Sequence, residues 1–231
     1  YCYLNASPLA QFSPGVKVFV NLPEIVEEID RQARAAGVPQ AFYLGKMQDG
    51  LALDPLTAYS EKLVPFFARH PFARQVIQTK SDAVDRLLEL EHNGHTALSW
   101  TLTPPRIAAR HEQSSPETEA RLAAMERCAK AGYRVCANVA PLLLEERWEE
   151  QYLELVCELL ARVPVRRIFL GGILLEHLSL RFYTSKFGGR IGATGTGNWR
   201  KVYGGRALSY RLGYGERFFR EVVKLASREH V

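Results

Sequence analysis

Long apolar segments are absent from this chain of 231 residues. No apolar run approaches the roughly 20 residues that a membrane-spanning helix needs. The chain also does not open on a basic segment followed by an apolar stretch and a cleavage site. We therefore expect a protein without a membrane partner.

Closely spaced cysteines are missing as well. The chain has 4 cysteines, at Cys2, Cys128, Cys136 and Cys157, and no C-x-x-C pair. Their wide spacing argues against a disulfide framework and against a self-contained zinc site, and it favours a reducing, cytoplasmic setting. Cys128 and Cys157 fall within amphipathic segments, so we interpret both as core residues.

Several short catalytic motifs are absent too. The sequence contains no Ser-His-Asp set at motif spacing, no H-E-x-x-H and no phosphate-binding P-loop. The glycine-rich stretch from Gly192 to Gly197 does not link a strand to a helix, as a dinucleotide-binding fold requires. These absences disfavour the common hydrolase, zinc-protease and nucleotide-binding classes.

What the chain does have is the composition of a folded domain with an uneven charge. It is 47% hydrophobic and 24% charged, which suits one large domain or one barrel. The net charge is +5, and basic residues heavily outnumber acidic ones from Arg166 to Val231. This excess favours an anionic partner for the last third of the chain.

Apolar, β-branched runs alternate with longer amphipathic stretches, as is typical of a parallel sheet flanked by helices. Strands are predicted over 16–20, 41–47, 74–79, 97–102, 134–143 and 167–175. Helices are predicted over 23–36, from Asp54 onward, and over 82–92, 115–130, 148–162, 178–186 and 216–228. Six such units predict an α/β fold, a partial (β/α)6 TIM-like barrel with its helices outside.

Polar side chains gather where the predicted strands end, and reactive groups of parallel barrels lie at those ends. Glu112 and Ser114 precede a helix and are interpreted as loop and cap residues. Cys136 falls early in its strand and is interpreted as a core thiol. The strand-end residues are Lys46, Gln48, Thr79, Lys80, Thr101, Thr103, Asn138, Ala140, Pro141, Glu176 and His177.

The first residues place Cys2 between Tyr1 and Tyr3. Taken alone, a buried thiol near a chain end explains Cys2. Together with the order of strands and helices, however, Tyr1-Cys2-Tyr3-Leu4 resembles the spore photoproduct lyase family of radical S-adenosylmethionine (radical SAM) enzymes. Further matching motifs are Val18–Asn21, Thr79-Lys80, His92-Asn93-Gly94, Ala131-Gly132-Tyr133 and Val139-Ala140-Pro141 followed by Trp148-Glu149-Glu150.

The resemblance implies a radical SAM partial barrel over residues 1–186 and a glycine-rich, basic and aromatic extension of the same domain over 187–231. It implies a 4Fe-4S cluster and S-adenosylmethionine as cofactors, with Cys2 matching the third cysteine of a C-x-x-x-C-x-x-C loop. The other two cysteines would lie upstream of Tyr1, so the chain is expected to be an N-terminally truncated, divergent member that is inactive by itself.

The implied reaction starts when the reduced 4Fe-4S cluster cleaves S-adenosylmethionine to a 5′-deoxyadenosyl radical. This radical abstracts hydrogen from a thymine-dimer photoproduct in DNA, and the product is two thymines. The resemblance also implies an electron donor such as flavodoxin or ferredoxin. Three thiolates leave one iron of the cluster open for the cofactor.

The same resemblance assigns roles to individual residues. Lys80 matches the lysine that contacts the cofactor carboxylate, Thr101 preserves a hydroxyl that contacts the cofactor, and Ala140 lies near its adenosine. Tyr1 and Tyr3 match tyrosines of a radical relay. The alternatives are a solvent-facing lysine, an ordinary strand threonine and tyrosines that serve only in packing.

One departure separates the chain from the founding lyase. Lys46 lies where the family has a cysteine that returns a hydrogen atom to the product, and a lysine cannot donate one as a thiol does. Two alternatives therefore remain beside photoproduct repair: a radical SAM enzyme of the same family with another substrate, and a nucleic-acid-binding barrel without catalysis.

The last third of the chain alternates cations with aromatic rings and glycines. Arginine and lysine engage phosphates, and aromatic rings fill the gap left by an extruded base. By resemblance, this region forms a β-hairpin that contacts DNA, although a plain surface hairpin is the alternative. The expected DNA-binding residues are Arg200, Lys201, Tyr203, Arg206 and Arg211.

Overall fold

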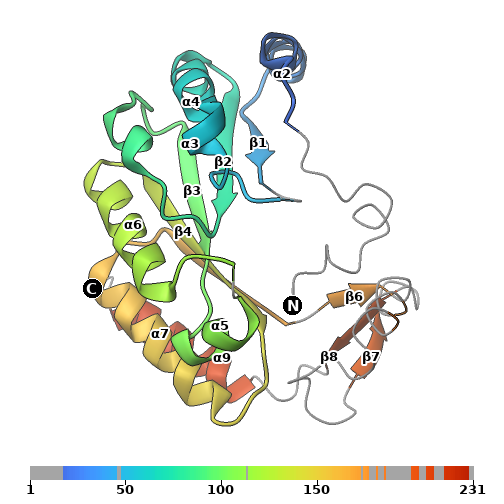
Figure 1. The fold of residues 1–231 in the computed structure, drawn as a ribbon, viewed down its shortest axis with the longest axis vertical. Helices are drawn as coiled ribbons and strands as arrows, with labels where there is room; N and C mark the ends of the chain where they lie inside the picture. Colours follow the sequence, from blue (N-terminus) through green and yellow to red (C-terminus); the bar gives the residue numbers. More distant parts are fainter. Residues whose placement is uncertain are drawn as a thin grey trace.

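A computed structural model describes residues 18–45, 48–112, 114–172, 174–176, 181, 185, 199–202, 207–210 and 216–228. Its centre is a five-stranded sheet in which all neighbouring strands are parallel and the strand order follows the sequence (Figure 1). The strands are β1 (Gln40–Leu44), β2 (Ala73–Thr79), β3 (Thr96–Thr101), β4 (Arg134–Leu142) and β5 (Arg167–Gly172).

Helices connect these strands and cover one face of the sheet, where α4 packs on β2 and β3 and α6 packs on β4 (Figure 1). The helical elements are α2 (Leu22–Ala36), α3 (Asp54–Thr57), α4 (Tyr59–Arg69), the 3-10 helix η2 (Asp85–Glu89), α5 (Pro105–His111), α6 (Thr118–Lys130), α7 (Trp148–Arg162) and α9 (Glu216–Arg228). Parallel strands with helices between them form the α/β half-barrel expected from the sequence.

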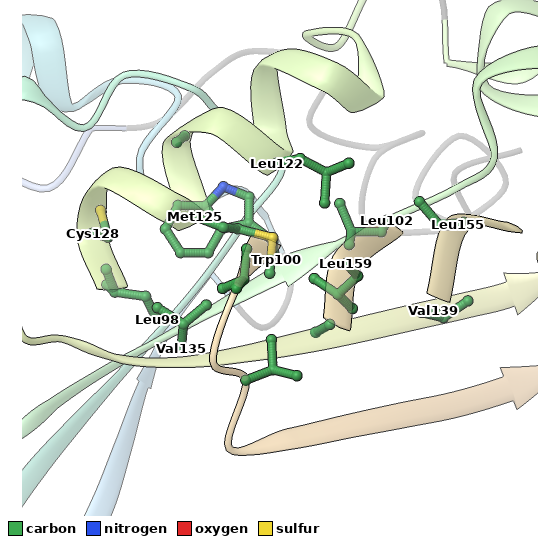
Figure 2. Packing of buried hydrophobic residues seen from close by; sticks show 14 of the residues in the cluster. Leu98, Trp100, Leu102, Leu122, Met125, Cys128, Val135, Val139, Leu155 and Leu159 are labelled. Carbon is green, nitrogen blue, oxygen red and sulfur yellow. The ribbon is translucent and has the colours of Figure 1, made fainter. Parts of the chain in front are cut away.

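The core lies between the sheet and its helices. Leu98 and Trp100 of β3 point toward Met125 of α6, and Figure 2 shows them packed together with residues of β4 and α7. Trp100 also donates its indole N–H to the carbonyl oxygen of Ser81, 2.9 Å away. Because side chains alternate along a strand, the residues between these core positions lie on the opposite face of the sheet.

That opposite face carries polar side chains of β3 and β4. Asn138 donates an amide N–H to Ser99 Oγ at 2.9 Å. Cys136 precedes Asn138 on the same face and is half-buried. Its interpretation as a core thiol is therefore wrong, since the core side of β4 is formed by Val135, Ala137 and Val139.

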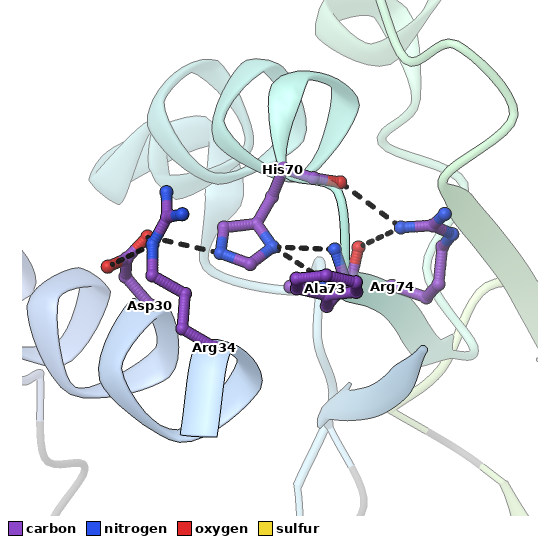
Figure 3. A network of polar contacts seen from close by, with 6 residues as sticks. Asp30, Arg34, His70, Ala73 and Arg74 are labelled. Atoms are coloured by element: carbon purple, nitrogen blue, oxygen red, sulfur yellow. Dashed lines mark hydrogen bonds and ion pairs between the residues drawn. The ribbon is translucent and has the colours of Figure 1, made fainter. Parts of the chain in front are cut away.

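A buried histidine fastens α2 to the sheet. Nδ1 of His70 accepts hydrogen bonds from the backbone N–H groups of Phe72 and Ala73, at 3.0 and 2.7 Å (Figure 3). Its other nitrogen therefore carries the proton and donates to Asp30 Oδ1 of α2 at 3.1 Å. Arg34 holds the same carboxylate, so α2 and the start of β2 share one polar network.

A second, antiparallel sheet has the strand order β6-β8-β7. It contains β6 (Leu174–Glu176), β7 (Trp199–Val202) and β8 (Ala207–Tyr210), and β7 pairs with β8 from Trp199↔Tyr210 to Val202↔Ala207. The hairpin expected in the basic and aromatic extension is therefore present. Since β6 begins directly after β5, the small sheet starts at the carboxyl edge of the large one.

Three sequence-based boundaries are wrong. Of the strand expected over 16–20, the described residues Val18–Val20 form no strand and Val20 is 90% exposed, while residues 16 and 17 lie outside the described part of the chain. The helix expected over 82–92 is reduced to η2, and the carbonyl oxygens of Ser81 and Leu87 accept the Trp100 indole and the Tyr133 hydroxyl. The strand expected over 167–175 is divided between β5 and β6 of two sheets.

Other differences are smaller. The helix expected over 115–130 starts at Thr118, and α5 precedes it with Pro105 in its first turn. Cys157 is exposed because the core face of α7 is formed by Tyr152, Leu155, Val156 and Leu159, so its assignment to the core is wrong. Most of the helix expected over 178–186 lies outside the described residues. None of the described helices is long and apolar enough to cross a membrane.

Candidate active site at the carboxyl edge of the sheet

The strand register brings the predicted cofactor-binding residues to one edge of the sheet. Thr79 at the end of β2 pairs with Trp100, so Lys80 follows β2 at the level of Thr101. Thr101 in turn pairs with Asn138 of β4, two positions before Ala140. Lys80, Thr101 and Ala140 therefore lie at the carboxyl ends of three adjacent strands.

Asp49 fixes the backbone on which Lys80 is mounted. Its Oδ2 accepts the backbone N–H of Lys80 at 2.6 Å, and its Oδ1 accepts the hydroxyl of Thr79 at 2.7 Å. Oδ1 also accepts the N–H groups of Leu51 and Ala52, each at 2.9 Å. One carboxylate thus ties the loop after β1 to the end of β2.

The Lys80 side chain ends beside a buried carboxylate. Lys80 Nζ lies 3.2 Å from Glu112 Oε1, and the side chains are 25% and 2% exposed. The hydroxyl of Thr103 donates to the same oxygen at 2.8 Å, and Glu112 Oε2 accepts a hydrogen bond from the Arg121 guanidinium. Lys80, Glu112 and Arg121 form an ion triad at this edge, because Glu112 pairs with both cations.

Arg121 extends this triad to the end of β3. Its side chain is fully buried. Its Nη1 donates to the carbonyl oxygen of Thr101 at 3.1 Å, and its Nε donates to that of Pro116 at 2.8 Å. A buried charge is tolerated only when it is paired and hydrogen-bonded, and Arg121 meets both conditions.

Ala140 lies beside Gly171 and the Phe169 ring of the neighbouring strand β5. A Cβ atom on Gly171 of β5 would lie 3.5 Å from Ala140 Cβ and 2.9 Å from the ring of Phe169. The loop after Ala140 is held by the Tyr152 hydroxyl, which donates to the Pro141 carbonyl oxygen at 3.2 Å and accepts the Leu143 N–H at 3.0 Å. The Ala140-Pro141 peptide bond is cis.

A second acid and its partners lie on the loops of the same edge. Glu145, which follows β4, has one oxygen 2.6 Å from His111 Nε2 and the other 3.0 Å from Arg110 Nη1. Both partners belong to α5, which follows β3. This contact fixes the two loops relative to each other.

Sequence reasoning missed Asp49, Glu112 and Arg121. Glu112 was assigned to a loop, and no motif marks Arg121, which lies within a helix. The available signal was chemical: a lysine expected at the inner end of a barrel strand needs an anionic partner, and acidic residues on the neighbouring loops were the candidates.

Other predicted site residues fall outside the described part of the chain. These are Tyr1, Cys2, Tyr3, Lys46, His177, Tyr203, Arg206 and Arg211, while Arg200 and Lys201 are described only as backbone of β7. Among the described residues, no three histidine, cysteine, aspartate or glutamate side chains form a group that could hold a metal ion.

The described residues suit S-adenosylmethionine. Lys80 supplies a partly exposed ammonium group for a carboxylate, and Thr101 is half-buried at the next strand end. Ala140, at the third strand end, carries only a methyl group and lies beside Gly171 of β5. The fit of a 4Fe-4S cluster depends on Cys2, which the structure does not describe.

Comparisons with known proteins identify the relatives of the chain. The curated spore photoproduct lyase of Geobacillus sp. (strain Y412MC61) is 29% identical over 189 residues, which cover 81% of this chain and 52% of the relative. That of Bacillus subtilis (strain 168) is 28% identical over 166 residues, which cover 71% and 48%. The chain therefore spans about half the length of these curated relatives.

Solved structures confirm the half-barrel fold. A spore photoproduct lyase double mutant with bound AdoMet and dinucleoside spore photoproduct matches with a TM-score of 0.83 at 22% identity, covering 97% of this chain and 68% of that one. A lyase complexed with dinucleoside spore photoproduct matches with a TM-score of 0.79, at the same identity and coverage. The family model described as spore photoproduct lyase matches residues 1–186, and the chain therefore belongs to the spore photoproduct lyase family.

Proposed function

We propose that the chain forms the S-adenosylmethionine-binding half-barrel of a radical SAM enzyme that repairs a thymine-dimer photoproduct in DNA. The observation that carries this proposal is the position of Lys80, Thr101 and Ala140 at one edge of the sheet. Membership of the lyase family supports the reaction class, as do the relatives whose structures contain AdoMet and dinucleoside spore photoproduct.

Each of these residues has a distinct task in the proposal. The Lys80 ammonium binds the cofactor carboxylate, since a compact positive charge suits a charged oxygen pair. The Thr101 hydroxyl binds a polar group of the cofactor, and Ala140 allows the adenosine to approach the strand closely. The protein thereby orients the cofactor and excludes water from it.

Cys2 would hold one iron of a 4Fe-4S cluster, together with two further thiolates. When bound, the cluster and the cofactor supply the one-electron chemistry that starts with removal of a hydrogen atom from the substrate. Tyr1 and Tyr3 are proposed to return a hydrogen atom through a relay. A small redox protein such as flavodoxin or ferredoxin is the proposed electron donor.

DNA binding is assigned to the hairpin of β7 and β8. The proposed contacts are made by Arg200, Lys201, Tyr203, Arg206 and Arg211. Because the small sheet starts at the carboxyl edge of the large one, a duplex held there lies near the cofactor site. Cations on a hairpin bind the phosphate backbone without reading sequence.

Turnover of damaged DNA tests the proposal. The full-length protein, with its cluster reconstituted without oxygen, is incubated with S-adenosylmethionine, a reductant and photoproduct-containing DNA. We expect thymine to be restored and the cofactor to be consumed. The matched control is Lys80→Met, which keeps most of the length of the side chain without its charge and should abolish cofactor consumption.

A second candidate function has one observation in its favour. Lys46 occupies the place of the hydrogen-donating cysteine, which favours a family member with another substrate. Cofactor consumption without restored thymine would support that candidate against photoproduct repair. DNA binding with neither cofactor binding nor consumption would instead indicate a binding protein that has kept the barrel.

A further inference from the structure

The ion triad at the site contains one cation that a ligand can reach. The Arg121 side chain is 0% exposed, the Glu112 side chain 2% and the Lys80 side chain 25%. A cofactor entering at this edge therefore meets the Lys80 side chain, while the side chains of Glu112 and Arg121 are buried beneath the surface. This arrangement separates a contact residue from the residues that hold it.

Glu112 is itself fixed from several sides. Thr103, which follows β3, donates to one of its oxygens, and Arg121 of α6 donates to the other. The same Oε1 that accepts the Thr103 hydroxyl lies 3.2 Å from Lys80 Nζ. A lysine side chain has four rotatable carbon–carbon bonds, so a fixed counter-ion restricts the ammonium group to a small region before a ligand arrives.

The same network also reaches the second cofactor-binding position. Arg121 donates to the carbonyl oxygen of Thr101 as well as to Glu112. Two buried side chains, Glu112 and Arg121, therefore link the Lys80 ammonium group to the backbone of Thr101. The relative placement of this ammonium group and backbone depends on this pair and not on the strand register alone.

We propose that Glu112, supported by Arg121, is a positioning residue that holds the Lys80 ammonium where it receives the carboxylate of S-adenosylmethionine. The inference rests on the proposed function, because it concerns the same cofactor site. Glu112 makes no contact with the cofactor in this arrangement, and its effect passes through Lys80. Replacing such a residue changes the binding affinity for ligands that carry the carboxylate and leaves the affinity for other ligands unchanged.

Two ligands distinguish this role from a general structural one. S-adenosylmethionine has a sulfonium and the amino acid group, whereas methylthioadenosine has the same adenosine on a neutral sulfur and lacks both the amino group and the carboxylate. In Glu112→Gln the side chain keeps its size and its hydrogen bond with Thr103 but loses its charge. We expect calorimetry to show about tenfold weaker binding of S-adenosylmethionine, the effect of releasing one long side chain, and unchanged binding of methylthioadenosine.

Glu112→Gln leaves the buried Arg121 without its carboxylate partner, which could unfold the protein, so the test needs a second variant. The pair Glu112→Gln with Arg121→Gln removes both charges together and should show the same selective loss. The control is Asp54→Asn, because Asp54 is also buried and its carboxylate accepts two hydrogen bonds from Ser60, in another part of the fold. That variant should bind both ligands as the unchanged protein does.

A Lys80→Met background completes the test. Once the lysine is absent, Glu112→Gln should cause no further loss of S-adenosylmethionine affinity. Equal weakening of both ligands, or a loss that persists without Lys80, would show a merely structural role and overturn the inference. If Glu112→Gln binds S-adenosylmethionine with unchanged affinity, the inference about Glu112 is wrong but the proposed function stands. If the unchanged protein does not bind S-adenosylmethionine, the proposed function is wrong as well.

Discussion

The turn that leads from α6 into β4 buries two weak acids. Cys128 is fully buried near the end of α6, and Tyr133 is 5% exposed just before β4. Burial raises the pKa of the Cys128 thiol to about 12. Burial also raises the pKa of Tyr133 well above its ordinary value, and a Cys128 thiolate would raise it further. Both groups are therefore held in their neutral forms.

Alkaline instability follows from these two groups. Each has a higher pKa in the folded protein than in the unfolded chain, so the stability it contributes is present below the unfolded pKa and is lost as the pH rises. We expect the free energy of unfolding to fall as the pH rises above about 9, where an unfolded thiol ionises. Urea denaturation at a series of pH values measures this free energy of unfolding.

A matched substitution assigns the effect to Cys128. Cys128→Ala removes the titrating thiol, and the fall in stability between neutral pH and pH about 10 should become smaller, with only the Tyr133 part remaining. An unchanged slope would assign the alkaline loss to other groups. Alkylation at neutral pH offers a second check, because exposed Cys157 should react while Cys128 reacts only after unfolding.

At the same scale, the sequence predicted the positions of Lys80 and Thr101 at strand ends better than it predicted the residues that hold them. Lys80 and Thr101 were identified because a strand end and a family motif coincide there. Glu112 and Arg121 were missed because a buried ion pair leaves no local pattern: their partners come from segments far apart in the chain. Pairing across a fold is set by tertiary packing, which periodicity does not reveal.

At the level of elements, α2 illustrates how a helix near the sheet edge is held. It packs on β1 and β2, and apolar residues such as Val26 and Ile29 contact the small cluster around Phe67. The polar link is the His70 network, in which one buried ring satisfies two backbone N–H groups and an aspartate (Figure 3). Removing that ring leaves buried groups without partners.

His70→Ala is therefore expected to destabilise the protein by about 2–4 kcal/mol, since one buried and one partly buried N–H group lose their acceptor. Hydrogen exchange should rise in α2 and at the start of β2 before it rises elsewhere. The matched control is Arg34→Ala, which removes an exposed partner of Asp30 and should cost less than about 1 kcal/mol. Equal effects of the two substitutions would contradict this account of the network.

Element boundaries show the same limit of sequence reasoning. The long helices α2, α7 and α9 and the strands β2, β3 and β4 were predicted within a few residues, because their apolar spacing is regular. The segment around η2 was mistaken for a full helix because its carbonyl oxygens serve distant side chains. The division between β5 and β6 was missed because an apolar run does not show which sheet it joins.

At the scale of the whole molecule, two regions with different tasks meet at one edge. The half-barrel positions Lys80, and the small sheet carries the basic hairpin proposed to bind DNA. The hairpin strands lie far from Lys80 in sequence and share no hydrogen-bonded ladder with β2 or β3. Substitutions in the hairpin should therefore change DNA binding without changing cofactor binding.

The double variant Arg200→Ala with Lys201→Ala tests this separation. If each cation neutralises one phosphate, the slope of log affinity against log salt concentration becomes less steep by about 2, and damaged and undamaged DNA lose affinity to the same extent. Fluorescence anisotropy across a salt series measures both quantities, and calorimetry should show unchanged S-adenosylmethionine affinity.

Glu158→Gln with Glu154→Gln on α7 is a control for net charge, because it raises the charge without touching the hairpin. An unchanged salt slope in the hairpin variant would place the DNA contacts elsewhere, whereas a loss of cofactor affinity would mean that the two regions act as one.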